Sequence, residues 1–169
     1  MSQPSANEDF AASLLTFRTD RNLSREDLAK KASISRNTLY LIEEVKTNVR
    51  LLTMCRLATA LKIHPCQFFS SARNGCLAPT RYAGSNLPAI VARNIKQLRE
   101  QRGLSQNELT KLAQLPRGYI SEIERSQPDL TLDVLSRIAA ALDVPVHLPV
   151  IHNANRYLPA DESDGTQRE

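Results

Sequence analysis

The chain has 169 residues, of which 41% are hydrophobic and none is tryptophan, and its formal net charge is +4. No run approaches the roughly 18 apolar residues of a membrane span, and the first residues lack a charged-then-apolar leader, so neither a span nor a signal peptide is expected. Three cysteines, an odd number without metal-ligand spacing, favour a reduced, cytoplasmic protein. The mildly basic charge suits nucleic-acid phosphate but is weak evidence by itself.

The first predicted element is a helix that opens on a capping box. Ser5 and Glu8 stand three residues apart, so each side chain can bind the backbone N–H of the other residue. Phe10, Leu14 and Phe17 follow at helical spacing, which predicts one buried face. The chain is therefore expected to begin its ordered part with a helix.

The next stretch, Leu23–Glu43, has the pattern of two short helices joined by a tight turn. Ser24 and Asp27 form a second capping-box pair, and Ser35 can cap the helix that follows the turn. The outward face of that helix is polar and mostly uncharged. This pattern predicts a helix-turn-helix, whose second helix is shaped to lie in a DNA major groove.

Further helices are predicted after a polar loop. Leu51–Leu61 has an apolar face, and Pro65 suits the first turn of a short fifth helix, with Phe68-Phe69 adding apolar surface. Residues 71–85 contain Gly, Pro and Ser without a helical period. They are predicted to be an interdomain linker that follows a first domain over residues 8–70.

The second half of the chain repeats the first without a gap, at a shift of 81 residues. Identical residues fall on each other at Leu23-Ser24 and Leu104-Ser105, Leu28 and Leu109, Arg36 and Arg117, Ile42-Glu43 and Ile123-Glu124, and Ala60-Leu61 and Ala141-Leu142. This predicts a duplicated domain. We call residues 8–70 repeat 1 and residues 86–150 repeat 2. Repeat 2 ends differently, because the apolar alternation of Val144–Val150 predicts an extended segment, and residues 151–169 are predicted to be a disordered tail.

Both repeats carry one pattern of apolar and polar residues. In repeat 1 it comprises Leu23-Ser24, Leu28-Ala29, Ala32, Ile34-Ser35, Leu39, Ile42-Glu43, Leu57-Ala58, Ala60-Leu61 and Ile63. In repeat 2 it comprises Leu104-Ser105-Gln106, Leu109, Ala113, Leu115, Ile120-Ser121, Ile123-Glu124, Ile138-Ala139, Ala141-Leu142 and Val144. This pattern resembles the helix-turn-helix domain of phage repressor and Cro proteins, the xenobiotic-response-element family. The resemblance implies an all-α protein with two tandem repressor-like five-helix helix-turn-helix domains joined by a linker.

Some positions depart from the family pattern. The family glutamine that touches phosphate and braces the recognition helix is Gln106 in repeat 2 but Arg25 in repeat 1. An arginine can still reach phosphate, whereas the bracing is left open. The turn glycine and the glycine after the recognition helix are replaced by Ser33 and Val45 in repeat 1 and by Gln114 and Ser126 in repeat 2. Side chains tolerate a positive φ less easily than glycine, so the loop after the recognition helix of repeat 1 is expected to differ.

The resemblance also assigns the residues that would meet DNA. Base edges would be read by Ser35, Arg36, Asn37 and Leu41 in repeat 1 and by Arg117 and Glu122 in repeat 2, where Pro116 and Gly118 fill the other places. Phosphates would be contacted by Arg25, Thr38, Lys46 and Asn48 and by Gln106, Tyr119, Arg125 and Gln127. Gly118 offers no side chain, and Glu122 either accepts a hydrogen bond from cytosine N4 or reads no base and is neutral or salt-bridged. Repeat 1 is therefore predicted to supply most base recognition.

The resulting hypothesis is a sequence-specific DNA-binding transcriptional regulator, a repressor, with no enzymatic activity, cofactor or metal. Its expected partner is double-stranded operator DNA, and a homodimer of chains and an antirepressor or other regulatory protein are left open. One alternative is an antitoxin-like or other protein-binding module that also regulates its own gene. Another is an activator that contacts RNA polymerase through Glu26, Asp27 and Glu108.

The two recognition helices differ, so one chain is expected to meet two unlike half-sites, most simply one helical turn or about 34 Å apart. The linker would then tether two weak contacts at roughly millimolar effective concentration. A symmetric dimer of chains would instead present four recognition helices, with Val144–Val150 and Phe68-Phe69 as candidate interfaces.

Overall fold

The computed structural model describes residues 5–69 and 86–151, so the predicted linker and all but the first residue of the predicted disordered tail lie outside the described residues. Repeat 1 comprises α1 (Ala6–Asp20), α2 (Arg25–Lys31), α3 (Arg36–Glu43), α4 (Leu51–Leu61) and the 3₁₀ helix η1 (Pro65–Phe68). Repeat 2 comprises α5 (Leu87–Gln101), α6 (Gln106–Leu112), α7 (Tyr119–Ser126), α8 (Leu132–Ala141) and the 3₁₀ helix η3 (Leu148–Val150). Within the described ranges the sole extended pairing is an isolated bridge, which confirms the all-α class.

The helices begin at the capping residues that the sequence indicates. Ser5 caps α1, and its backbone N–H donates to the Glu8 carboxylate at 2.6 Å. Ser105 and Glu108 form the same reciprocal pair at the start of α6, and Thr131 caps α8. Each cap satisfies an N–H group that has no partner inside the helix, so local sequence determines where these helices start.

The segment that closes repeat 2 corrects its prediction. Val144–Val150 is not extended but forms a turn followed by η3. Pro149 lies in the first turn of η3, where its fixed φ is compatible with a helix and its missing N–H is not needed. The Asn94 side chain of α5 donates to the carbonyl oxygens of Pro149 and Ile151 at 2.9 and 2.6 Å. A short 3₁₀ helix therefore stands where the sequence predicts a short fifth helix in repeat 1 and an extended segment in repeat 2.

One hydrophobic core runs through both repeats. Buried residues of α1, α4 and η1 belong to the same cluster as those of α5, α8 and η3. The rings of Phe10 and Phe68 lie 4.4 Å apart between centroids. Phe68-Phe69 were predicted as apolar surface, but both are fully buried, because η1 packs on α1 and meets η3 of the other repeat. They cannot serve as an interface to a second chain without opening this core.

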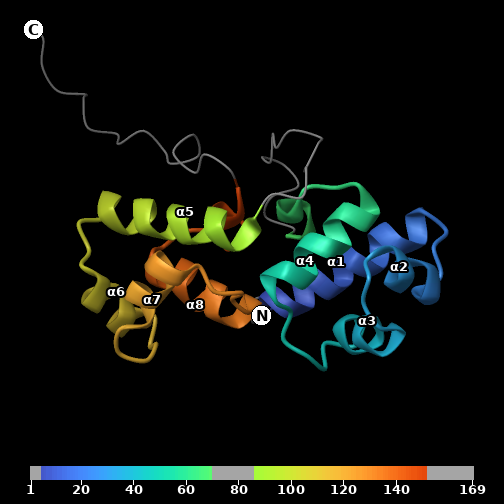
Figure 1. Ribbon diagram of the computed structural model, residues 1–169, viewed down its shortest axis with the longest axis horizontal. Helices are drawn as coiled ribbons and strands as arrows, with labels where there is room; N and C mark the ends of the chain where they lie inside the picture. The colour runs from blue at the N-terminus through green and yellow to red at the C-terminus, as the bar shows by residue number, and fades with distance from the viewer. Residues whose placement is uncertain (1–4, 70–85, 152–169) are drawn as a thin grey trace, which may run out of the picture.

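The two repeats pack directly against each other (Figure 1). Helix α1 contacts α8, and α4 contacts α5. Two backbone bonds flank the bridge between Arg50 and Thr131: Leu51 N–H donates to Leu130 O at 2.9 Å, and Leu132 N–H donates to Val49 O at 2.7 Å. The repeats are thus joined by a packed junction and not by a tether alone. In the view of Figure 1, α3 and α7 both lie toward the lower edge, on either side of this junction.

The cysteines fit their prediction only in part. Cys55 is in the reduced form, but the buried Cys66 is disulfide-bonded. Its sulfur also lies 3.0 Å from Nδ1 of the buried His64. The expectation that all cysteines are reduced is wrong for Cys66, since spacing along the chain does not report which sulfurs the fold brings together.

Candidate nucleic-acid interface

Local capping sets the geometry of α2, the turn and α3. The Ser24 hydroxyl accepts from the N–H of Asp27 at 3.1 Å and donates to its carboxylate at 2.6 Å. Hydrogen bonds from the Ser24 hydroxyl and then from its backbone N–H lower the pKa of Asp27. The turn holds Ser33 at a φ of +52°, after which Ser35 caps α3 by accepting from Thr38 N–H at 2.9 Å. The predicted helix-turn-helix is therefore present in repeat 1.

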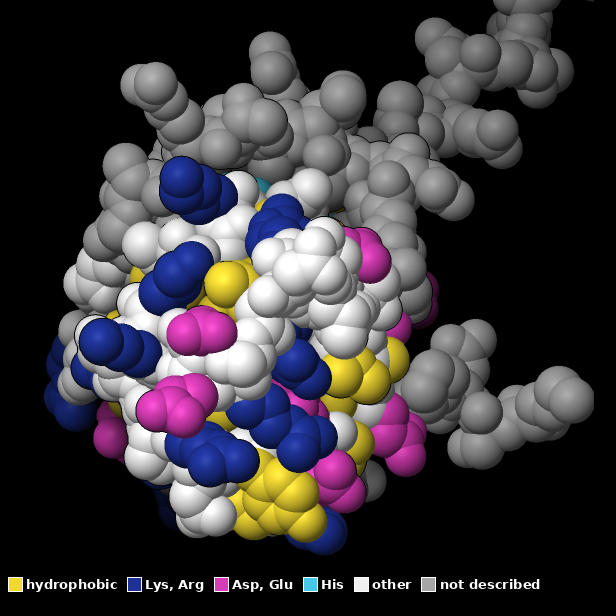
Figure 2. All heavy atoms as spheres, turned by 90° about the vertical axis from the view of Figure 1, so that its right-hand side faces the viewer, with side chains coloured by type: hydrophobic (Ala, Val, Ile, Leu, Met, Phe, Trp, Pro, Cys, Tyr) yellow, Lys and Arg dark blue, Asp and Glu magenta, His cyan; other side chains and the backbone are white. Residues whose placement is uncertain are grey.

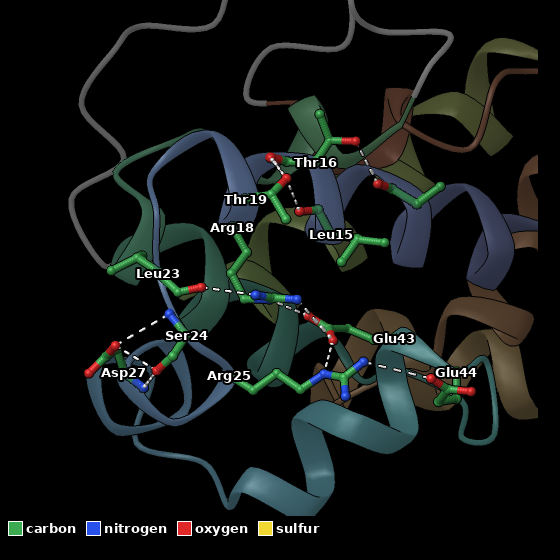
Figure 3. A network of polar contacts seen from close by, with 11 residues as sticks. Leu15, Thr16, Arg18, Thr19, Leu23, Ser24, Arg25, Asp27, Glu43 and Glu44 are labelled. Carbon is green, nitrogen blue, oxygen red and sulfur yellow. Dashed lines mark hydrogen bonds and ion pairs between the residues drawn. The ribbon is translucent and has the colours of Figure 1, made fainter.

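A buried carboxylate braces α3 against the two helices before it (Figure 3). The Glu43 side chain is 2% exposed and lies between Arg18 of α1 and Arg25 of α2. Arg18 Nε donates to Glu43 Oε1 at 2.6 Å, and Arg25 Nε donates to the other carboxylate oxygen. Hydrogen bonding to Glu43, and then the charge of Glu43, raises the pKa of Arg25. The bracing that the sequence left open for Arg25 is thus found.

The same brace recurs in repeat 2, 81 residues later. Glu124 of α7 accepts from Arg99 at 2.7 Å and from the Gln106 amide at 2.8 Å. The hydrogen bond to Glu124 raises the pKa of Arg99, which also donates to Leu104 O at 2.8 Å, as Arg18 does to Leu23 O at 2.9 Å. A guanidinium in one repeat and a neutral amide in the other therefore fill the same bracing position.

The base-reading residues predicted in repeat 1 lie together on one side of α3. Ser35, Arg36 and Asn37 are exposed, and Leu41 is half-buried one turn further along. The Ser35 hydroxyl is already engaged in the cap of α3. A hollow beside this surface is lined by Arg25, Arg36, Asn37 and Tyr40. Arg36 and Asn37 are thus exposed beside this hollow, and their contact with base edges stays a prediction.

Tyr40 is part of this surface, although the sequence analysis did not single it out. Its ring lies close to Arg25 and Lys46, whose cationic groups are 5.4 and 5.2 Å from the ring centroid. Lys46 Nζ also donates to the Tyr40 hydroxyl at 3.3 Å. Two residues predicted to contact phosphate are therefore gathered around one aromatic ring. The available signal was the spacing of four from Arg36, which puts Tyr40 one turn along the same helix.

The recognition helix of repeat 2 starts later than its counterpart in repeat 1. Helix α3 begins at Arg36, whereas α7 begins at Tyr119, so Arg117 lies in the turn before the helix. Pro116 has no side-chain acceptor to cap a helix here, and Gly118 has a φ of +79°, outside the helical region. Arg117 is exposed and extends from the turn.

The other residues predicted in repeat 2 lie along α6 and α7 and at the end of α7. Glu122, Arg125 and Gln127 are exposed, whereas Gln106 and Tyr119 are half-buried. Gln127 ends α7 at a φ of +51° while Ser126 remains helical; in repeat 1, the positive φ falls on Val45, at +54°. The loops after the two recognition helices thus differ by one residue, but the reason expected from the sequence is wrong: Val45 adopts the positive φ at the glycine position of the family, and it is repeat 2 in which the positive φ moves to the next residue.

Asn48 has a role at the junction. Its carboxamide oxygen accepts from the N–H of Asp133, in the first turn of α8, at 3.2 Å, and from Asn7 Nδ2 at 3.3 Å. The contact of Asn48 with phosphate stays a prediction. The structure adds a capping role for this residue that sequence reasoning missed, because its partner lies 85 residues away.

Figure 2 views the molecule from the end where α2 and α3 lie. Lys and Arg side chains form their largest group in the lower part of this face, with acidic side chains dispersed among them. A surface that binds phosphate needs such positive charge. Within residues 5–69 and 86–151, no cluster of three His, Cys, Asp or Glu side chains is arranged to hold a metal. No helix in these two ranges combines the length and apolar character required to cross a bilayer.

Two capped helices around a turn, with the second exposed and braced, define a helix-turn-helix protein. The sequence profile of the Helix-turn-helix family matches residues 14–68 and 95–148, more than half of the chain. The chain therefore belongs to the helix-turn-helix family and contains its domain twice.

Three similar proteins have names that refer to gene control. The HTH-type transcriptional regulator SinR from Bacillus subtilis is 37% identical over 59 residues, covering 34% of this chain and 53% of SinR. Control protein C.SmaI from Serratia marcescens is 34% identical over 61 residues, covering 36% of this chain and 73% of C.SmaI. The immunity repressor protein of Bacillus phage phi105 is 38% identical over 56 residues, covering 33% and 39%. The match to this chain spans about half of the length of SinR.

Proposed function

We propose that this protein is a sequence-specific DNA-binding transcriptional regulator of the cytoplasm, a repressor without enzymatic activity, that binds operator DNA through α3 and α7. The observation that carries the proposal is the pair of recognition helices. Each is held by a buried glutamate and an arginine from the first helix of its repeat, and both lie toward one side of the molecule (Figure 1). A firmly held helix with an exposed polar side is what recognition in the major groove requires.

Repeat 1 reads bases through α3. The Arg36 guanidinium can donate two hydrogen bonds to guanine O6 and N7, and the Asn37 carboxamide can pair with adenine N6 and N7. Leu41 offers an apolar contact for a thymine methyl group. A good bidentate pair discriminates against the wrong base by about 1–3 kcal/mol, so Arg36 and Asn37 carry most of the sequence preference.

Repeat 2 contributes less base recognition. Arg117 can reach a guanine from the turn before α7, and Glu122 can accept from cytosine N4. Gly118, which matches Asn37, has no side chain to present. The half-site of repeat 2 is therefore expected to be less strictly defined than that of repeat 1.

Phosphate contacts orient both helices on the duplex without reading sequence. In repeat 1 they fall to Arg25 and Lys46, which both lie close to the Tyr40 ring, and to Thr38 and Asn48. In repeat 2 they fall to Gln106, Tyr119, Arg125 and Gln127. Since Glu43 fixes the direction of the Arg25 guanidinium, that contact is ordered in advance of DNA binding.

Repression is favoured over the two alternatives. One similar protein is named an immunity repressor. The activator alternative loses support because the carboxylates of Asp27 and Glu108 are engaged in helix caps, although Glu26 is exposed. The antitoxin-like alternative depends on the polar tail, and residues 152–169 lie outside the described residues. Binding of an antirepressor or other regulatory protein stays a prediction.

The proposal is tested by selecting binding sites from a pool of randomised double-stranded DNA with the full chain. The enriched duplex is then titrated with wild type, Arg36→Ala, Arg117→Ala and Lys96→Ala. Lys96 is exposed on α5, outside both helix-turn-helix segments, where it forms an ion pair with Glu100, and its replacement removes the same charge. Arg36→Ala is expected to weaken binding by about 5- to 150-fold, the equivalent of about 1–3 kcal/mol, while Lys96→Ala changes it less than twofold. An unenriched pool, or equal effects of Arg36→Ala and Lys96→Ala, would refute DNA reading by α3.

A further inference from the structure

The junction between the repeats follows the same shift of 81 residues as the sequence. Arg50 and Thr131, which form the antiparallel bridge, occupy one position in the two repeats. The two backbone hydrogen bonds beside the bridge are also equivalent under that shift. The bond from Leu51 N–H to Leu130 O in one direction matches the bond from Leu132 N–H to Val49 O in the other. A contact in which each partner uses the same residues is isologous and has a twofold axis. Here the twofold axis relates two halves of one chain.

Two side-chain hydrogen bonds across the junction are related by the same twofold symmetry. Asp129 Oδ1 accepts from Leu52 N–H, in the first turn of α4, at 2.9 Å. Asn48 Oδ1 accepts from Asp133 N–H, in the first turn of α8, at 3.2 Å. Asn48 matches Asp129, and Leu52 matches Asp133, so each repeat caps the fourth helix of the other.

The helix contacts complete the symmetry. Helices α1 and α5 are equivalent, as are α4 and α8, and the contacting pairs are α1 with α8 and α4 with α5. The 3₁₀ helices η1 and η3, which close the two repeats, also touch each other. This interface is a continuous part of the core, with Leu51 and Leu132 fully buried, so the relative placement of α3 and α7 is fixed by packing.

From this geometry we propose that one chain is a complete single-chain dimer. It binds an operator of two unlike half-sites in inverted orientation, at one fixed spacing, with a stoichiometry of one chain per operator. The inference rests on the proposed DNA-binding function and specifies its ligand. The pseudo-twofold axis requires inverted half-sites, because it relates the two recognition helices by a half-turn and not by a translation. Direct half-sites would require a translation between the repeats, which the junction excludes.

The half-sites are inverted but not identical. At matching positions, repeat 1 presents Asn37 and Leu41 where repeat 2 presents Gly118 and Glu122. A symmetric palindrome would therefore place one half-site against the wrong recognition helix. A tethered pair of domains would tolerate changes of spacing by whole helical turns, whereas a packed junction holds a single distance.

The test uses the duplex selected from the randomised pool and the full chain. Native mass spectrometry of the complex measures chains per duplex. Binding is then measured on four altered duplexes, in which the repeat 2 half-site is turned to direct orientation, or 5 or 10 base pairs are inserted between half-sites, or the spacer is changed in sequence at constant length. Ten base pairs restore the helical phase, because B-DNA turns once in about 10–10.5 base pairs. Arg36→Ala and Arg117→Ala assign each half-site by the half in which base preference relaxes.

The expected results are one chain per duplex and at least a tenfold loss of affinity for the direct orientation and for both insertions. The spacer change at constant length is expected to cost less than threefold. Two chains per duplex, or affinity recovered with the 10 base-pair insertion, overturns the single-chain dimer while leaving DNA binding intact. If Arg36→Ala has no effect on any duplex, the proposed function itself fails, and the two failures are thus distinguishable.

Discussion

Replacing Glu43 by glutamine tests the brace that holds the recognition helix of repeat 1. Glutamine has the shape of glutamate and keeps one acceptor oxygen, but it removes the negative charge and places an NH₂ group against a guanidinium. The Glu43 side chain is 2% exposed, and those of Arg18 and Arg25 are 13% and 38% exposed. The variant therefore leaves Arg18 charged and largely buried without a counter-ion.

The magnitude follows from the burial of the three groups. Removing one partner of a buried ion pair costs about 3–5 kcal/mol. Water screens Arg25 and one hydrogen bond survives, so the expected loss in the free energy of unfolding is about 2–3 kcal/mol. For a protein of this size, about 1 kcal/mol shifts Tm by roughly 2–4 °C, which predicts a fall of about 5–10 °C.

Urea unfolding followed by circular dichroism measures the loss, with Glu44→Gln as the matched control. Glu44 lies next in the chain, and its side chain is 40% exposed. Its carboxylate oxygens lie 3.7 Å from a terminal guanidinium nitrogen of Arg25 and 3.8 Å from Lys46 Nζ. Its replacement should change stability by less than about 0.5 kcal/mol, and 1 M salt should remove that difference while leaving the Glu43→Gln loss nearly intact. If both variants lose the same small amount, the buried carboxylate does not brace α3 energetically, and the reasoning is refuted.

Three further outcomes are expected. Val45→Gly should raise the free energy of unfolding by about 1 kcal/mol in the same urea titration, because a β-branched residue is strained at a φ of +54°. Lys62→Gly, at a φ of +55°, is the control and should raise it by less, because lysine is not β-branched. The double variant Asp27→Asn, Glu108→Gln should lose less stability than wild type as the pH falls below about 4, the ordinary pKa of a carboxyl group. In wild type the caps lower the pKa of both carboxyl groups in the folded state, so the unfolded state takes up these protons first and the free energy of unfolding falls with pH. Equal slopes of the free energy of unfolding against pH between about pH 4 and 3 in the two proteins would contradict this. Tyr40→Ala should weaken specific and non-specific DNA binding alike by about fivefold, because the ring holds two cations that are proposed to bind phosphate, through contacts of about 1 kcal/mol. Loss of base preference instead would make Tyr40 a base-reading residue.

Much of each repeat could be predicted from short-range pattern. Helix starts depend on contacts three residues apart, so Ser5, Ser24 and Ser105 identify them directly. The positive φ at Ser33 and Gln114 could be anticipated because other members of the family place glycine there. The buried face of each helix follows from apolar spacing alone.

Longer-range features were not accessible to that reasoning. Whether Arg25 braces Glu43 depends on a packing distance between α2 and α3, and two kinds of side chain satisfy it in the two repeats. The late start of α7 results from Pro116 and Gly118 acting together, although the alignment with repeat 1 predicts a helical turn there. The sequence predicts an apolar surface at Phe68-Phe69 because nothing local indicates that the other repeat covers them.

The junction explains how the two recognition surfaces could diverge without loss of the assembly. Its bridge and flanking bonds join backbone atoms, so Arg50 can face Thr131 and Val49 can match Leu130 without changing the pairing. The recognition surfaces have no such constraint from the partner repeat. In a homodimer of separate chains, every mutation in the recognition helix alters the recognition of both half-sites. In a duplicated chain, a mutation alters the recognition of one half-site at a time. Selection for an asymmetric operator would therefore produce recognition helices α3 and α7 that differ in sequence, and a junction that keeps its twofold symmetry.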